Sequence, residues 1–481
     1  MEEGFILSGV CYGVSTLSVP TRSASPRPSV PDYRPSWRQE VVKSMGLALP
    51  LASAQVAQAA TGFIDTLMTG KLGSNALAAV GLGSTLFMFL ALLGINVTAA
   101  VSSLVAEAHG ANQQRAIAPI TEQGLWLALL VSMPTVLFLT HVEPCLRLLG
   151  QDSRIISLTV PYLDAIAWGY FPAIVFAVLR NFVSALSRPR SVLVIMVMAV
   201  GLNGLANYSL MFGKWGLPAL GVAGTGWAST LTYWSMAIAL LAYILLHPEF
   251  RAYQLFRTLH RFRWRQFRAI AVLGIPMGIS SLFESGLFCT ATVLAGQLGV
   301  TVLAAHQIAL QTAALTFMVP LGISQATTVR VGQYLGQRDP QGVKMAGYVG
   351  IGLGMGFMGL MAIAFLTLPR LIISAYLDMS APENQAVIAT AVSLLAVGGM
   401  FQLVDGIQVI AAGALRGLQD TAVPMAIGLV AYWGVGFTTS YLAAFHWGWE
   451  GVGLWSGLAI GLAIAAVSFT IRFRLLCHRS T

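Results

Sequence analysis

The feature that most constrains this chain is a series of long stretches without a charged residue. They cover residues 46–64, 72–106, 191–213, 215–246, 285–329 and 451–471. A helix needs about 20 apolar residues to cross a bilayer core. Only 9% of the 481 residues are charged and 56% are hydrophobic, a balance typical of chains surrounded by lipid. The apolar positions are continuous rather than alternating, which argues against a membrane β-barrel. We predict an all-α polytopic membrane protein.

Glycine, proline and charged interruptions divide the apolar runs into twelve predicted transmembrane helices. These lie near residues 45–69, 76–106, 116–141, 156–183, 191–212, 221–246, 269–298, 302–335, 342–368, 386–414, 422–445 and 452–475. In this scheme all but five of the 27 Lys and Arg residues fall on one side. The exceptions are Lys71, Arg147, Arg154, Lys214 and Arg370. The positive-inside rule then predicts a multi-pass protein of the inner (plasma) membrane with both termini cytoplasmic.

An internal repeat relates the two halves of the chain. The segment LALPLASAQVAQAATGFIDTLMTGKLGSNALAA from Leu47 aligns with LGIPMGISSLFESGLFCTATVLAGQLGVTVLAA from Leu273, 226 residues later. The same offset pairs Gly110 with Gly336. We therefore predict two six-helix bundles related by a tandem parallel repeat. Transporters with such halves bind substrate between them and alternate access around it.

The remaining segments set the predicted domain boundaries. Residues 1–40, rich in Ser, Pro and Arg, are predicted to be a mobile cytoplasmic tail. An N-lobe over 41–247 and a C-lobe over 269–481, with a short basic C-terminal tail, flank a basic cytoplasmic linker at 248–268. The linker sequence RAYQLFRTLHRFRWRQFR predicts an interfacial helix at the anionic inner leaflet rather than a nucleic-acid site.

An acidic side chain within an apolar span is costly unless it faces a cavity or a partner. Asp65 lies near the end of the first predicted span. Asn203 and Asn207 are four residues apart and share one face of the fifth. One carboxylate and two amide oxygens suit a hard monovalent cation or a proton-responsive site. The alternative is an interfacial carboxylate that pairs with Lys71.

Glu284 and Asp405 lie deep within the seventh and tenth spans. Glu284 is far from any basic residue in sequence, and Asp405 is flanked by Gln402 and Gln408. Cation binding, with Na⁺ as a candidate ligand at Glu284 and Asp405, is the favoured interpretation. The alternative is that helix–helix hydrogen bonds merely satisfy each carboxylate.

Other polar groups indicate less. Glu107 and Arg330 lie at span ends and are predicted to be interfacial. Glu122 has no set of polar residues near it in sequence that would indicate a site. His306 is predicted to be a packed, hydrogen-bonded group, with a direct pH role as the alternative. No P-loop, zinc or nucleophile motif appears in a suitable context, so ATP-driven transport and enzymatic activity lose support. The four cysteines form no CxxC pair.

Six segments together resemble the multidrug and toxic compound extrusion (MATE) family, in its NorM-like branch. They are FIDTLMTGKLGSNALAAVGLG, GLPALGVAGTGWAS, FESGLF, VLAAHQIALQ, VPLGISQATTVRVGQYLGQRD and FQLVDGIQVIAAGALRGLQDTAVPM. The resemblance spans about residues 41–475. It implies two six-helix bundles around a V-shaped cleft and export driven by inward Na⁺ or H⁺. On matching positions it implies an N-lobe cation site at Asp65, Asn203 and Asn207. It implies a C-lobe cation and substrate site at Glu284 and Asp405.

The expected function is therefore secondary active multidrug export. Small organic cations or amphiphiles would leave the cell against inward Na⁺ or H⁺, with no cofactor beyond the coupling ion. The expected surroundings are membrane lipid, without nucleic acid or an obligate protein partner. The alternative function is a flippase for a lipid-linked glycan or other amphiphile, which a basic cavity would favour.

Overall fold

The computed structural model describes residues 36–148 and 150–479, and this part of the chain is helical, without a β-strand. The first half contains α1 (Trp37–Gly70), α2 (Ser74–Thr98), α3 (Ala100–Gly110), α4 (Gln114–Thr140), α5 (Glu143–Leu148), α6 (Ser153–Ala185), α7 (Arg190–Phe212), α8 (Val222–Leu246) and α9 (Pro248–Arg251).

The second half contains α10 (Trp264–Gln297), α11 (Val300–Gln337), α12 (Pro340–Thr367), α13 (Pro369–Ser374), η1 (Pro382–Asn384), α14 (Gln385–Gly417), α15 (Ala422–Leu429), η2 (Val430–Phe437), α16 (Thr438–Tyr441), η3 (Leu442–His446) and α17 (Glu450–Arg479). Within the described residues, twelve helical segments are long and apolar enough to cross a membrane. The predicted number of spans is confirmed.

The first span begins earlier than predicted. Ser36 is the N-cap of α1, and its hydroxyl accepts a hydrogen bond from the Gln39 backbone N–H while the Gln39 side chain accepts from the Ser36 N–H. Such a reciprocal capping box fixes a helix start. Residues 37–40 therefore belong to α1 and not to the predicted tail, whose residues 1–35 lie outside the described part.

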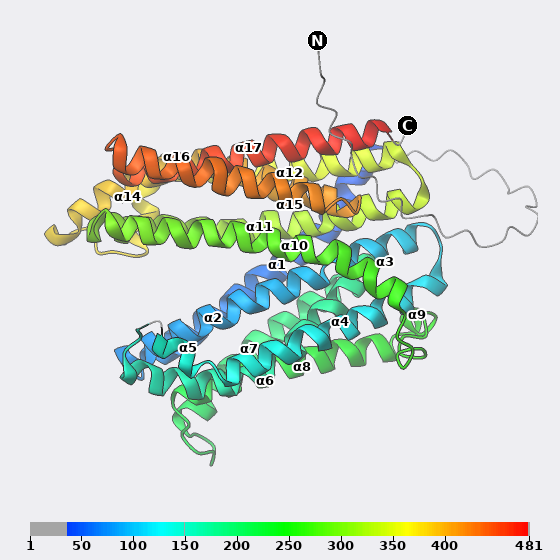
Figure 1. Cartoon of the computed structure of the whole chain (residues 1–481), viewed down its shortest axis with the longest axis horizontal. Helices are drawn as coiled ribbons and strands as arrows, with labels where there is room; N and C mark the ends of the chain where they lie inside the picture. Colours follow the sequence, from blue (N-terminus) through cyan, green and yellow to red (C-terminus); the bar gives the residue numbers. More distant parts are fainter. Residues whose placement is uncertain (1–35, 149, 480–481) are drawn as a thin grey trace, which may run out of the picture. The chain divides into compact units, whose positions relative to one another are not determined.

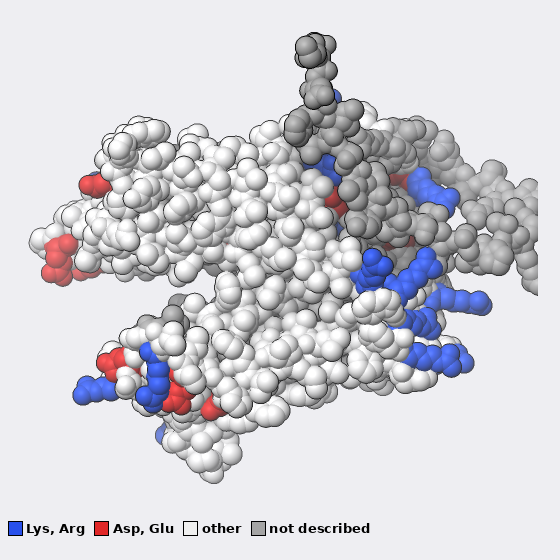
Figure 2. Space-filling view, viewed as in Figure 1, with Lys and Arg blue, Asp and Glu red and all other residues white. Residues whose placement is uncertain are grey.

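The spans form two bundles, as predicted. In the N-terminal bundle α6 contacts α2, α4 and α8, and in the C-terminal bundle α14 contacts α11, α12 and α17 (Figure 1). The bundles meet at one end and diverge toward the other, so that a cleft opens between them (Figure 2). Most of the visible Lys and Arg side chains gather where the bundles meet. We call this end, where α3 ends and α4 begins, the basic end.

Two glycines allow the bundles to approach closely at the basic end. A Cβ atom at Gly110 would overlap the backbone carbonyl of Gln333, and one at Gly336 would overlap that of Glu107. The 226-residue offset relates Gly110 to Gly336 and also Glu107 to Gln333. The two contacts are therefore equivalent under the internal repeat, and α3 and α11 cross backbone to backbone at its axis.

The linker between the bundles is not the predicted interfacial helix. Only α9 is helical, and residues 252–260 form consecutive turns. Gln254 and Phe256 have positive φ angles of 49° and 76°, which a continuous right-handed helix cannot contain. Hydrogen bonds to the buried Glu122 of α4 hold this conformation instead. The next span, α10, begins at Trp264, five residues before the predicted C-lobe boundary.

Candidate ion and substrate sites

The structure brings together the three residues predicted for the N-lobe. The Asn207 side-chain amide donates to Asp65 Oδ1 at 2.6 Å and to Asn203 Oδ1 at 3.1 Å. Asp65 lies on α1 and both asparagines on α7, where they are fully buried. Among the described residues, no ion pair joins Asp65 to Lys71, so the alternative of an interfacial carboxylate paired with Lys71 is not supported.

A fourth group completes this set and was missed by sequence reasoning. The Ser229 hydroxyl on α8 donates to Asp65 Oδ2 at 3.1 Å. Its separation of 164 residues from Asp65 gives no sequence signal, and serines are common in apolar spans. Three helices thus converge on one carboxylate.

One buried oxygen in this set lacks a partner. Asn207 Oδ1 receives no hydrogen bond from any described residue. Buried polar groups are normally paired, so an unpaired acceptor beside a carboxylate is an incomplete ligand shell. The described residues contain no group of three His, Cys, Asp or Glu side chains that could hold a metal. A cation here would depend on amide and hydroxyl oxygens as well as Asp65, which suits a proton or a hard monovalent ion.

The C-terminal bundle holds a second set of unpaired oxygens, along α14. Asp405 Oδ1, Gln402 Oε1 and Gln408 Oε1 are buried and receive no hydrogen bond from the described residues. The amide nitrogens are engaged, with Gln402 donating to Thr316 and Gln408 to the Tyr432 hydroxyl. Because the nitrogens are held by these partners, the amide oxygens remain available as acceptors near the carboxylate.

Glu284 occupies a small polar cavity beside this set. The cavity offers roughly 40 Å³ to water-sized molecules, and Gln408, Arg416 and Asp420 also line it. A single water needs roughly 10–15 Å³ by this measure, so the cavity can hold a few waters or a small hydrated ion. Glu284 and Asp405 are close enough to interact electrostatically. No hydrogen bond among the described residues links this region to Asp65.

Arg416 changes the predicted surroundings of Glu284. Glu284 is far from any basic residue in sequence, yet Arg416 lines the same cavity. The two residues lie on α10 and α14, and only folding brings them together. Arg416 therefore supplies a positive charge near a carboxylate that has no basic neighbour in the sequence.

His306 is a packed, hydrogen-bonded group within the C-terminal bundle. The Trp455 Nε1–H donates to His306 Nδ1 at 3.1 Å, and His306 Nε2 lies 3.0 Å from the Thr292 hydroxyl. Both ring nitrogens thus have partners, and the side chain is fully buried. This environment agrees with the packing role that the sequence predicts.

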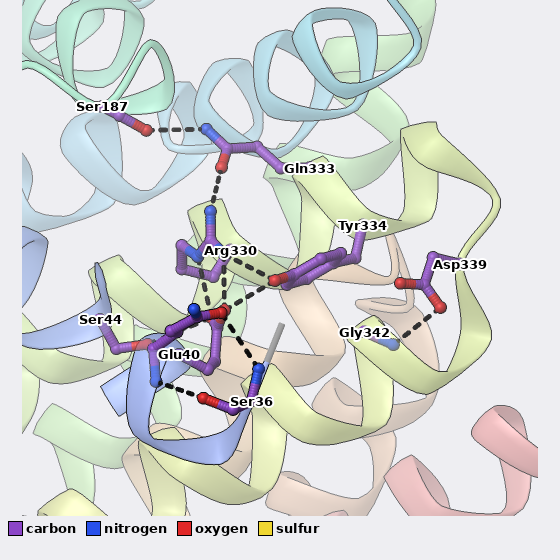
Figure 3. A network of polar contacts seen from close by, with 10 residues as sticks. Ser36, Glu40, Ser44, Ser187, Arg330, Gln333, Tyr334, Asp339 and Gly342 are labelled. Atoms are coloured by element: carbon purple, nitrogen blue, oxygen red, sulfur yellow. Dashed lines mark hydrogen bonds and ion pairs between the residues drawn. The ribbon is translucent and has the colours of Figure 1, made fainter. Parts of the chain in front are cut away.

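A polar network closes the basic end between the bundles (Figure 3). Arg330 of α11 donates from Nε and Nη2 to the two carboxylate oxygens of Glu40, at 2.8 and 2.6 Å. The Tyr334 hydroxyl donates to Glu40 Oε2 at 2.7 Å. The Glu40 side chain is 0% exposed and that of Arg330 11%. Arg330 is therefore not the interfacial residue that was predicted.

The network continues from Arg330 to the N-terminal bundle. Arg330 Nη1 donates to Gln333 Oε1 at 2.9 Å, and Gln333 Nε2 donates to the Ala185 carbonyl and the Ser187 hydroxyl, both at 2.9 Å. We call Glu40, Arg330, Gln333, Tyr334 and Ser187 the basic-end network. It connects α11 of the C-terminal bundle to α1 and to the end of α6 in the N-terminal bundle. These contacts keep the two bundles together at the closed side of the cleft.

The fold and these sites define a class of protein, a multi-pass membrane transporter with two bundles around a central cleft. Its family follows from comparison with known proteins. A MatE family model matches residues 50–209 and 276–442. The chain therefore belongs to the MatE family. The two matches begin 226 residues apart, which confirms the internal repeat.

Curated relatives and solved structures agree with this assignment. The chain is 45% identical over 435 residues to a "Probable multidrug resistance protein NorM" of Synechocystis sp., covering 90% of this chain and 94% of that one. A relative with the same description from Synechococcus sp. is 42% identical, with coverage of 92% and 96%. The resemblance to the NorM-like branch is confirmed.

Solved structures share the fold at low identity. The eukaryotic MATE transporter AtDTX14 superposes with a TM-score of 0.80 at 19% identity, covering 92% of this chain and 100% of that one. An outward-facing conformation of a multidrug resistance MATE transporter gives a TM-score of 0.83 at 18% identity, with coverage of 92% and 97%.

Proposed function

We propose that the chain is a secondary active multidrug exporter. It moves cationic or amphiphilic organic compounds out of the cell in exchange for inward Na⁺ or H⁺. The relatives described as multidrug resistance proteins support this proposal. The observation that carries it is the presence, in each bundle, of a buried or half-buried carboxylate beside unpaired amide oxygens.

The mechanism follows from competition for negative charge. In the conformation with an open cleft, a coupling ion neutralises Asp65, Glu284 or Asp405. This neutralisation weakens the attraction for a cationic compound, which leaves through the cleft. When the basic end opens instead, loss of the ion restores the charge and a new compound binds. Exchange results because each ligand shifts the same two-state equilibrium through its differential affinity.

The basic end faces the cytoplasm in this proposal. The excess of Lys and Arg at that end supports this orientation through the positive-inside rule. The membrane is then the inner, or plasma, membrane, and both ends of the chain are cytoplasmic. The open cleft faces the outside, and the basic-end network closes the cytoplasmic route.

The alternative, a flippase for a lipid-linked glycan or other amphiphile, would be favoured by a basic cavity. Arg416 lines the cavity of Glu284, but Glu284 and Asp420 line it too. The Arg472 side chain donates to Asp420 at 2.8 Å. The charged groups at this cavity therefore show no excess of positive charge that would favour an anionic headgroup.

Reconstituted protein tests the proposal. The purified transporter is reconstituted into liposomes that are loaded with a fluorescent cation. A Na⁺ gradient and a pH gradient are then imposed separately. Export driven by at least one gradient is expected. In detergent, the same ion should weaken dye binding, and the dye should weaken ion binding by the same factor. Movement of a fluorescent lipid without any response to either gradient would contradict ion-coupled export and favour the flippase.

A further inference from the structure

The linker between the bundles carries positive charge without acidic partners. Six arginines occur between residues 251 and 268, and no Asp or Glu does. None of these arginines forms an ion pair with a described carboxylate. The nearest acids are engaged elsewhere: Glu249 pairs with Arg188 at 2.6 Å, and Glu122 accepts from Thr258. Arg251, Arg257, Arg261, Arg265 and Arg268 are exposed.

The backbone that presents these arginines is fixed to α4. Glu122 accepts from the Thr258 backbone N–H at 3.1 Å and from its hydroxyl at 2.6 Å. Trp126 Nε1 donates to the Leu259 carbonyl at 2.9 Å. Gln123 donates to the Arg261 carbonyl at 3.2 Å and accepts from the Arg263 N–H at 3.1 Å. The linker is therefore a rigid platform and not a loose tether.

The platform lies along the side of α4 rather than beyond its end. Its anchors Glu122, Gln123 and Trp126 lie in the third and fourth turns of α4, which begins at Gln114. The span α10 follows at once and has 34 residues, or about 51 Å. This length exceeds a hydrocarbon core of about 30 Å. A helix of this length extends beyond the core, and the arginines at its start favour the basic end, next to the platform, as the end that does so.

Aromatic side chains mark the same level. The Phe262 ring lies 6.1 Å from Trp126 and 5.1 Å from Phe267, and Trp264 stacks on Phe267 at 5.8 Å. Phe262 and Trp264 are exposed. Aromatic rings of this kind are enriched at the membrane–water interface, and arginine near an anionic leaflet gains about 1 kcal/mol.

We propose that the platform, residues 252–263 with the first turns of α10, binds anionic phospholipid headgroups. Its arginines pair with headgroup phosphates while the Phe262 and Trp264 rings enter the apolar boundary. The fixed backbone lowers the entropic cost of binding, because the arginines are already held at headgroup level. This inference relies on the platform's charge and position, not on the identity of the exported compound.

The binding of anionic headgroups to the platform is tested by measuring which lipid the protein surface prefers. Purified protein is reconstituted with spin-labelled phosphatidylglycerol or phosphatidylcholine, and electron paramagnetic resonance gives the enrichment of each lipid at the protein surface. The wild type should prefer phosphatidylglycerol. The R257Q/R261Q/R265Q variant should lose most of that preference, by at least about five-fold if each arginine contributes as expected near an anionic surface.

The control variant R154Q/K214Q/R370Q removes the same charge from exposed positions at the other end. It should keep the wild-type preference. Glu122→Gln, which retains every arginine but weakens the anchor, should reduce the preference partially and provides a test if the triple variant folds poorly. Excess glycerol phosphate should not displace the lipid. Equal loss in both triple variants, an unchanged preference in R257Q/R261Q/R265Q, or displacement by glycerol phosphate would overturn the proposal.

Discussion

At the scale of single residues, the buried carboxylates fall into two kinds. In some, both oxygens accept hydrogen bonds, whereas in others an oxygen has no partner among the described residues. Glu122 and Glu40 are fully buried and have donors for both carboxylate oxygens. Asp405 is also buried, yet its Oδ1 has no partner among the described residues. A carboxylate left in this state is costly, which supports the proposal that Asp405 has a functional role.

We predict that Glu284→Gln and Asp405→Asn each abolish or strongly reduce ion-driven export. Both substitutions keep the side-chain shape and remove the charge that binds the coupling ion. Asp378→Asn is the matched control, since Asp378 is exposed and Ser380 donates to it at 2.6 Å from its hydroxyl. Hydrogen bonds from Ser380 lower the Asp378 pKa, so this carboxylate is ionised in the wild type.

Proteoliposome export under the driving gradient checks this prediction. Export by D378N should match the wild type, which shows that loss of one carboxylate alone does not impair the protein. Wild-type export by both E284Q and D405N would remove the C-terminal bundle from the coupling mechanism and leave Asp65 as the candidate.

Sequence could locate the carboxylates but not all of their neighbours. Asp65, Asn203 and Asn207 were predicted as one set because the asparagines are one helical turn apart. Ser229 and Arg416 were missed because their contacts depend on how distant helices pack. Glu40 was assigned to the tail because the Ser-, Pro- and Arg-rich composition continues almost to Trp37. Only its partner on α11 shows that this carboxylate belongs to the folded part.

At the scale of elements, the apolar pattern determined the spans because lipid excludes unpaired backbone groups. The conformation of the linker, by contrast, is not determined by its own residue pattern. Its basic and aromatic residues have a spacing that suits an amphipathic helix, but the side chains of α4 offer competing partners to its backbone. Tertiary hydrogen bonds therefore replaced the local helix, which no local pattern could reveal.

The crossing of α3 and α11 gives a prediction at this scale. Gly110→Ala or Gly336→Ala should separate the two helices, because the added methyl group would meet a backbone carbonyl that cannot move aside. Overpacking of this kind costs about 1–3 kcal/mol. We expect a lower melting temperature in detergent and a wider basic end.

Gly352→Ala on α12 is the control for this crossing. No atom lies within 4 Å of a Cβ built there, and alanine is the better helix former. Its thermal stability should equal or exceed that of the wild type. An equal effect of all three substitutions would show that helix propensity, rather than the close approach, governs the result.

At the scale of the whole molecule, the basic-end network exists only while that end is closed. Removing one member of a buried ion pair costs about 3–5 kcal/mol, because the other charge is left unpaired. Glu40→Gln or Arg330→Gln should therefore shift the population toward an open basic end. Replacing both charges, as in E40L/R330M, should restore much of the closed population, since no unpaired charge remains.

Distances between spin labels at Arg190 and Gln341, one exposed position in each bundle, report this equilibrium. Both single variants should show a longer distance than the wild type. If the single and double variants all keep the wild-type distance, the network contributes to folding but does not control opening.

The internal repeat gives the network a further consequence. The offset of 226 places Gln266 opposite Glu40 and Leu104 opposite Arg330, so the equivalent contact in the other half has no charges. The bundles pack together through α1 with α11 and, at the equivalent place in the repeat, through α2 with α10, and only the first of these pairs carries the Glu40–Arg330 ion pair. Opening of the basic end should then begin on the side of α2 and α10 and should break the Glu40–Arg330 pair last. A repeat whose two copies differ at these side chains would thus impose an order on the opening of the two sides of the basic end.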